Sequence, residues 1–246
     1  MKTNASESTT TPPHGLYARL SLKWKLLAGF GAVLALTALV GVVGLVGMYK
    51  VDDALVEVGR VRLPSVKGLY QIQEGAVGVR AVNAALMVEA LPADKRPGQH
   101  AMAEEFWKDV QEGWAEYEPL PQTAEEAAIW AKFVPAFRAW EETARATRRV
   151  LGEWESLRGA GKAEAAAEKY KEATGLFLTV GAQFKAMNEL LTQIIHLNVR
   201  VSDEAMAQGL ATATTARGVL TTGVVMAFGV GLATALLMTR SLTRRV

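Results

Sequence analysis

The sequence contains no cysteine, and this absence removes several classes of protein at once. Disulfide bonds, cysteine-based zinc sites, c-type haem attachment and thiol catalysis all require cysteine. Only three histidines occur among the 246 residues, and none has a partner at metal-ligand spacing. We therefore expect neither a metal site nor a cofactor.

Catalytic motifs and a strong excess of one charge are also missing. The sequence has no Ser/His/Asp set, no P-loop and no Gly-x-Gly-x-x-Gly. Adjacent glutamates, such as Glu104 with Glu105, diverge on a helix and form solvated faces instead of catalytic dyads. The net charge of +2 argues against nucleic acid as the main partner. We expect a protein that is not an enzyme and does not bind nucleic acid.

Two long apolar stretches without charge are present instead, at 26–48 and 219–238. At about 1.5 Å per residue the first would extend roughly 34 Å, against about 30 Å for the hydrocarbon core of a bilayer. Two alternatives are a pair of buried soluble helices and, for the first stretch, a cleaved signal peptide. A signal peptide has a shorter apolar core, and no A-x-A cleavage site follows this stretch at a sensible distance. We predict two transmembrane helices.

Basic residues flank both stretches and set the expected orientation. They are Arg19, Lys23 and Lys25 before the first stretch, and Arg240, Arg244 and Arg245 after the second. Residues 50–217 carry 20 Lys/Arg and 24 Asp/Glu, a net charge of −4. The positive-inside rule places the tail 1–25 and the end 239–246 in the cytoplasm. Residues 49–218 would then lie outside the inner (plasma) membrane.

The region between the two stretches has helical periodicity and no strand-like alternation. Apolar residues recur at steps of three and four, as in an a/d seam. One seam comprises Phe177, Val180, Phe184, Met187, Leu191, Ile194, Asn198, Val201 and Ala205. A second comprises Val51, Leu55, Val58, Arg62, Ser65, Leu69, Ile72, Ala76, Val79, Asn83 and Leu86. The fold class is therefore all-α, an antiparallel up-down four-helix bundle between two transmembrane helices.

Prolines, glycines and one cap divide the region into helices at 49–90, 98–118, 123–158 and 162–217. Thr123 and Glu126 fit a capping box at the start of the third helix. Pro64 predicts a kink in the first helix, or a restart with Pro64 in its first turn. Thr174 and Gly175 resemble a helix end and predict an interruption of the fourth helix.

This order of elements resembles the sensor portion of methyl-accepting chemotaxis receptors. The stretch LSLKWKLLAGFGAVLALTALVGVVGL is similar to their first membrane helix, and Arg62-Leu63-Pro64 to the Leu-Pro that often follows it. The segment from Thr239 to Arg244 resembles the start of a HAMP linker, although the usual proline is replaced by Arg245. The resemblance implies a homodimeric periplasmic bundle that senses a small molecule and signals through the second membrane helix to a cytoplasmic module or adaptor.

The sequence indicates an architecture that several kinds of protein share, so more than one function stays open. Residues 239–246 are too few for a complete HAMP domain, so we expect a piece of a longer receptor or a short relative without its own output. The same sensor could belong to a histidine kinase or a cyclase, and a non-signalling membrane scaffold is a further alternative. A homodimer is expected because the first helix carries additional apolar residues, Leu69 and Ile72, and the fourth carries Leu190, Ile195 and Leu197.

Candidate ligand-binding residues lie at one level of the first and fourth helices. They are Arg80, Asn83, Gln183 and Asn188. In the receptors that this chain resembles, arginines on the first helix can meet a ligand carboxylate near the dimer interface. The alternative is that Arg80 is solvated, while Asn83 and Asn198 fix the helix register.

Aromatic residues of the middle helices could line an apolar cleft, but their heptad spacing favours core packing. Small residues in the membrane helices could allow close helix packing. They are Gly41, Gly44 and Gly47 in the first helix, and Gly223, Ala227, Gly231 and Ala235 in the second.

Overall fold

The computed structural model describes residues 21–243, in which every regular element is a helix. The chain divides into two compact units, which are taken separately below. One unit comprises residues up to Asp52 together with those from Leu210 on, and the other is Asp53–Gly209. The predicted all-α fold class is confirmed.

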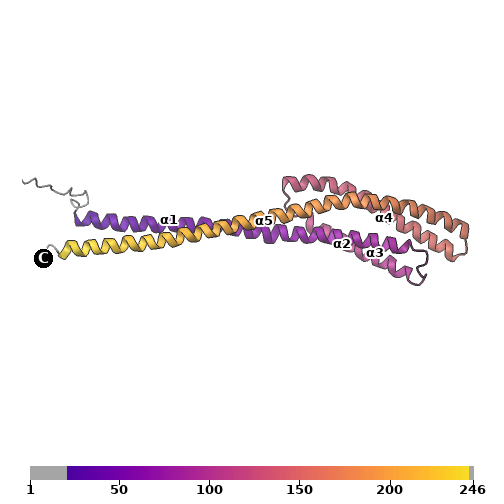
Figure 1. The fold of residues 1–246 in the computed structure, drawn as a ribbon, viewed down its shortest axis with the longest axis horizontal. Coiled ribbons are helices and arrows are strands. Elements are labelled where there is room, and N and C mark those ends of the chain that lie inside the picture. Colours follow the sequence, from indigo (N-terminus) through magenta and orange to yellow (C-terminus); the bar gives the residue numbers. More distant parts are fainter. Residues whose placement is uncertain (1–20, 244–246) are drawn as a thin grey trace, which may run out of the picture. The chain divides into compact units, whose positions relative to one another are not determined.

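The first unit pairs two apolar helices, α1 (Leu22–Val56) and the end of α5 (Ala163–Thr243). Figure 1 shows them side by side, α1 in indigo and the end of α5 in yellow. The less exposed residues of α1 recur at steps of three and four, which is heptad packing. They are Leu26, Gly29, Val33, Leu36, Val40, Gly44 and Gly47, and Val43 beside them is also half-buried. This face meets α5, whereas most of the other apolar residues of α1 are exposed.

Both helices are long and apolar enough to cross a membrane. Their most apolar 18-residue windows are 0% and 6% buried, whereas the core helix of a soluble protein would be mostly buried. The exposure of these windows therefore argues against the alternative of two buried soluble helices.

The second unit is a four-helix bundle. Its helices are α2 (Leu63–Leu86), α3 (Arg96–Tyr117), α4 (Ala124–Gly159) and the first part of α5. The connections at 87–95, 118–123 and 160–162 are short, so consecutive helices run antiparallel, as Figure 1 shows.

A short π-helix, η2 (Glu57–Arg62), precedes α2, and Pro64 lies in the first turn of α2. This position fits the predicted restart with Pro64 in the first turn, although α1, η2 and α2 follow one another without a loop. The missing N–H of proline falls where the π-helical turn gives way to the α-helix. The capping box is also confirmed: Glu126 N donates to Thr123 Oγ1 and Thr123 N donates to a Glu126 oxygen.

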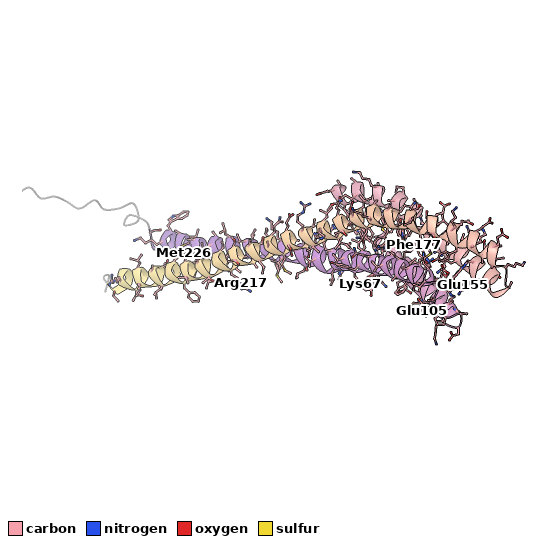
Figure 2. All side chains as sticks on the ribbon, turned by 45° about the vertical axis from the view of Figure 1, so that its right-hand side comes forward. Lys67, Glu105, Glu155, Phe177, Arg217 and Met226 are labelled. Atoms are coloured by element: carbon pink, nitrogen blue, oxygen red, sulfur yellow. The ribbon has the colours of Figure 1, made fainter. Side chains whose placement is uncertain are left out.

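The predicted interruption at Thr174–Gly175 is wrong, because α5 runs without a break from Ala163 to Thr243. A glycine inside a helix costs about 1 kcal/mol relative to alanine. Ala173 and Val180 on either side are both buried against the bundle, and that packing outweighs the local penalty. Figure 2 shows the nearby Phe177 on this continuous helix.

The bundle core is rich in aromatic side chains. Neighbouring ring centroids are 4.6–5.9 Å apart. The rings belong to Trp107, Trp114, Tyr117, Trp130, Phe133, Phe137, Trp140 and Phe184. Core packing of the aromatic residues is therefore confirmed. The seam from Val180 to Asn198 is also buried as predicted.

Candidate functional site

The four candidate ligand residues fall on different surfaces. Arg80 is exposed, and its guanidinium carbon lies 5.0 Å from the ring centroid of Phe184, the residue after Gln183. Asn188 accepts a hydrogen bond of 3.0 Å from Gln73 Nε2. Both contacts join α2 to α5. Because Gln73 and Arg80 are seven residues apart on α2, Asn188 and Arg80 do not share one contact level.

Asn83 lies apart from these contacts. It is fully buried, and its Nδ2 donates to Ala144 O of α4 at 3.1 Å. This contact fits the alternative role of a buried asparagine that fixes helix register. Asn83 Oδ1 and Gln183 Oε1 are buried without a hydrogen-bond partner in the protein, so each retains capacity for a polar guest. Among residues 21–243, no group of three His, Asp or Glu side chains could hold a metal ion.

A buried polar cluster at the end of the bundle where α2 begins connects η2 with α3, α4 and α5. Arg62 Nη1 donates to Glu126 Oε2 at 2.8 Å and to Asn198 Oδ1 at 2.9 Å. Glu126 Oε1 accepts hydrogen bonds of 2.7 Å from Tyr117 Oη and from Asn198 Nδ2. We call Arg62, Tyr117, Glu126 and Asn198 the base cluster. The charges are buried but paired, which satisfies the requirement for charge in a core.

The base cluster perturbs its titratable groups. Burial by itself would lower the pKa of Arg62, but hydrogen bonds to Glu57 and Glu126 outweigh burial and raise that pKa. Burial, helped by the hydrogen bond to Glu126, raises the pKa of Tyr117 far above its ordinary value. Arg62 is therefore a fixed cation and Tyr117 a neutral donor.

Sequence reasoning placed Arg62 and Asn198 on helical seams but did not find the base cluster. An arginine at a core position of an apolar seam was the available signal, because such a charge needs a partner. The partners are 64 and 136 residues away in the chain, so sequence spacing could not identify them.

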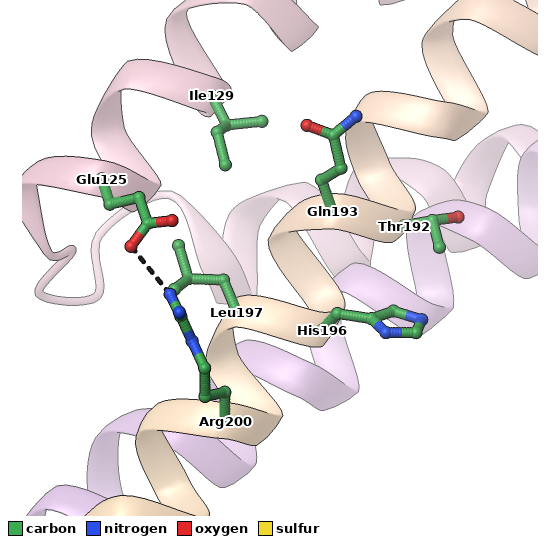
Figure 3. A pocket seen from close by; sticks show the side chains of 7 residues that line it. All are labelled: Glu125, Ile129, Thr192, Gln193, His196, Leu197 and Arg200. Atoms are coloured by element: carbon green, nitrogen blue, oxygen red, sulfur yellow. Dashed lines mark hydrogen bonds and ion pairs between the residues drawn. The ribbon is translucent and has the colours of Figure 1, made fainter.

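An open groove of about 580 Å³ lies where α4 meets α5, next to the base cluster (Figure 3). Its lining residues are Glu125, Ile129, Thr192, Gln193, His196, Leu197 and Arg200. Glu125 and Arg200 form an ion pair of 2.8 Å, and each side chain is more than half exposed. An exposed pair of this kind contributes about 0–1 kcal/mol and can exchange for other partners.

The far end of the bundle is held by Arg96, at the start of α3. Arg96 Nη1 donates to Leu86 O and to Glu155 Oε1, each at 3.0 Å, and Nη2 donates to Val88 O at 2.7 Å. Its guanidinium carbon lies 4.5 Å from the ring centroid of Trp154. These contacts join the end of α2, the start of α3 and the end of α4.

In the apolar unit, some of the predicted small residues lie at the contact between α1 and α5. A Cβ at Gly47 would meet Ala216 at 2.8 Å, and one at Gly44 would meet Leu220 at 3.3 Å. Gly223 lies against Val40, and Gly29, which was not predicted, lies against Thr234. A Cβ at Gly41 or Gly231 would have no atom within 4 Å. Ala227 is half-buried, and Ala235 is exposed.

The residues expected to support a dimer are mostly occupied within the chain. Leu69, Ile72, Ile195 and Leu197 are buried in the bundle, and Leu190 packs against its core. The expectation that they form a second, free apolar set is wrong, because four antiparallel helices bury more than one stripe of each helix. A different set on α2 is exposed, namely Leu63, Tyr70 and Val77.

Comparison with known proteins identifies the bundle. A family described as "Four helix bundle sensory module for signal transduction" matches residues 19–213. No curated protein and no solved structure matches the chain.

Proposed function

Because the chain belongs to the family of four-helix-bundle sensory modules for signal transduction, we propose that it is a transmembrane receptor of the methyl-accepting chemotaxis type. It senses a small molecule outside the membrane and passes a helix displacement to a cytoplasmic output module. The observation that carries this proposal is the chain order, in which the sensory bundle lies between two segments long and apolar enough to cross a membrane. The receptor itself has no enzymatic role.

The basic residues around the apolar stretches support an orientation in the inner membrane. Lys23 and Lys25 precede the first stretch, and Arg240 follows the second. The positive-inside rule puts both ends in the cytoplasm and the bundle in the periplasm or outside the cell. Reporter fusions after Gly15 and after Val246 should be active only in the cytoplasm, and periplasmic activity at either point contradicts this topology.

The ligand is proposed to bind along α2 and α5, near Arg80, Gln183 and Asn188, with Asn83 behind them in the core. Arg80 supplies an exposed positive charge, and Gln183 supplies a buried carbonyl oxygen without a protein partner. The site would take a small polar molecule that carries an acidic group. A thermal-shift screen of amino acids and organic acids against the full chain tests this site. Arg80→Ala should abolish the shift caused by any acid that binds.

A homodimer is proposed through the exposed stripe on α2. Leu63, Tyr70 and Val77 are seven residues apart and all exposed, so they form one line on the helix. The same stripe on a second copy is self-complementary about a twofold axis. Tyr70→Glu should weaken dimerisation of the full chain in detergent, measured by light scattering, whereas Leu178→Glu, at an exposed apolar residue of α5, should not. An unchanged dimer in Tyr70→Glu contradicts this interface.

Signal output is proposed to pass along α5 into the HAMP-like start at 239–246. The described part of α5 ends at Thr243, so Arg244, Arg245 and Val246 lie outside the described residues. Residues 1–246 fused to the cytoplasmic half of a chemoreceptor test the whole proposal. At least one compound of the panel should change the activity of the associated kinase in membrane vesicles.

Chimeras with other outputs separate the remaining alternatives. A response in a histidine kinase or cyclase fusion, with none in the chemoreceptor fusion, favours the corresponding output class. A correctly inserted, folded chain that responds in no fusion favours the non-signalling scaffold and contradicts a receptor.

A further inference from the structure

We propose that the base cluster is a latch that holds α5 at one lengthwise position against the start of α2, and that the receptor changes state by opening this latch. The inference rests on the proposed function, because a latch matters only if α5 moves. It assigns a regulatory role to Arg62 and Asn198, which neither the family nor the ligand site explains.

The contact between Arg62 and Asn198 joins the two helices that continue into the apolar segments. Asn198 is on α5, and Arg62 ends η2, which continues α1 without a loop. Gln73 of α2 also bonds to α5, but through partly exposed side chains. Among the described residues, the bond from Arg62 to Asn198 is the fully buried one between these two helices.

Glu126 is the fixed part of the latch. The capping box with Thr123 ties its carboxylate to the start of α4, and Tyr117 ties it to the end of α3. Glu126 bonds to Arg62 through one oxygen and to Asn198 through the other. Through Glu126, the α3–α4 pair, which stays in place in this proposal, therefore binds both η2 and α5 at one level.

Both moving partners have a second partner on their own helix. Arg62 Nε donates to Glu57 Oε1 at 2.7 Å, and Asn198 Nδ2 donates to Ile194 O at 3.1 Å. When the bond between Arg62 and Asn198 breaks, Arg62 keeps Glu57 and Asn198 Nδ2 keeps Ile194 O, so only the neutral Oδ1 of Asn198 loses its partner and no charge does. This fallback distinguishes the base cluster from an ordinary buried ion pair, whose opening strands a charge.

The π-helix makes the fallback of Arg62 possible. Glu57 and Arg62 are five residues apart, the spacing that a π-helix brings together, whereas residues five apart in an α-helix lie on different faces. Single π-turns also occur frequently at functional sites.

The expected movement is large enough to open the latch. Helix shifts in signalling proteins are about 1–2 Å. A slide of about 2 Å perpendicular to the 2.9 Å bond from Arg62 to Asn198 lengthens it to about 3.5 Å, beyond ordinary hydrogen-bond distance. Small displacements of α5 therefore break the bond from Arg62 to Asn198, while the bonds of each residue within its own helix remain.

The test compares Asn198→Leu with Asn83→Leu in the full chain in lipid nanodiscs. Both asparagines are fully buried, but Asn83 bonds only to the backbone of α4. The readout is the position of α5 along α2. Gln73 bonds to Asn188 at 3.0 Å and to Thr192 at 3.4 Å, one turn apart on α5. Because the chain has no cysteine, disulfide formation by Gln73→Cys with Asn188→Cys or with Thr192→Cys has no background.

The latch predicts that Asn198→Leu changes the ratio of the two cross-linking rates by about threefold or more, while Asn83→Leu leaves it within about 1.5-fold, as expected if α5 shifts only when the latch is broken. Intramolecular products are separated from intersubunit products by their mass. If Asn198→Leu does not fold, as judged by circular dichroism, Arg62→Lys replaces it, because lysine keeps the charge but not the forked donors.

An unchanged ratio in a folded latch variant overturns the inference, as does an equal change in Asn83→Leu. The cross-linking needs no ligand and no output domain. The proposed receptor function, which is tested by the kinase response of the chimera, can therefore fail or succeed independently.

Discussion

Removal of Arg62 should expose how much the bundle depends on its buried charge pair. In Arg62→Met the Glu126 carboxylate stays buried. The neutral donors Tyr117 and Asn198 remain, both at Oε1, and Oε2 keeps only the weak capping contact from Thr123 N. Breaking a buried pair in this way costs about 3–5 kcal/mol. We expect the free energy of unfolding to fall by that amount.

The double variant Arg62→Met/Glu126→Gln isolates the cost of the stranded charge. Glutamine keeps the capping box and can still accept from Tyr117. Glu126→Gln alone should cost about 1.5–3 kcal/mol, the value of hydrogen bonds to a charged group. The double variant should be more stable than the sum of the two single losses, by about 1–3 kcal/mol.

Tryptophan fluorescence during urea unfolding of the full chain in detergent measures these differences. Trp107, Trp114, Trp130, Trp140 and Trp154 lie in the bundle, so five of the six tryptophans report on it. With a slope of about 2 kcal/mol/M, a loss of about 4 kcal/mol lowers the midpoint by about 2 M. A loss under about 1 kcal/mol in Arg62→Met, or simple additivity in the double variant, would refute the reasoning.

Three further predictions concern the cap of α4, the Tyr117 hydroxyl and the continuity of α5. Thr123→Ala removes the cap acceptor of α4 and should cost about 1 kcal/mol of unfolding free energy, whereas Thr123→Ser should cost little. The pKa of Tyr117 is raised in the folded chain, so the folded state holds its proton more tightly and stability falls as pH rises above about 10, the ordinary tyrosine value. The decline between about pH 9 and pH 11, followed by urea midpoints, should be smaller in Tyr117→Phe. Ala213→Pro should interrupt α5 at a cost of about 3 kcal/mol and abolish output from the chimera. Ligand-induced thermal shifts of the bundle should persist in that variant, and full output from it would show that α5 is not the conduit.

The sequence was sufficient to predict the helices and their buried faces. Seams such as Val180 to Asn198 follow from the a/d period, which depends only on local helix geometry. Pro64 and Thr123 marked helix starts for equally local reasons. The false break at Gly175 arose because local propensity was weighed without the packing of Ala173 and Val180.

Partners between helices could not be predicted in the same way. The periodicity shows that Leu69 and Ile72 face other side chains, but not whether these belong to the same chain or to a second copy. Arg62 likewise stood on a seam without an identifiable partner, because Glu126 approaches it only once α4 has folded against α2. Which residues contact one another depends on how the helices assemble, and the periodicity of one helix does not reveal it.

The two turns at the far end of the bundle differ as places to insert a reporter protein. Arg96 donates hydrogen bonds to the carbonyls of Leu86 and Val88, so a domain inserted into 87–95 would disturb these bonds. Gly161 lies in an exposed turn at positive φ, and a Cβ there would meet nothing within 4 Å. Insertions succeed at exposed tips with few contacts. A fluorescent domain placed at Gly161 should therefore leave the bundle intact and make the chain usable as a biosensor.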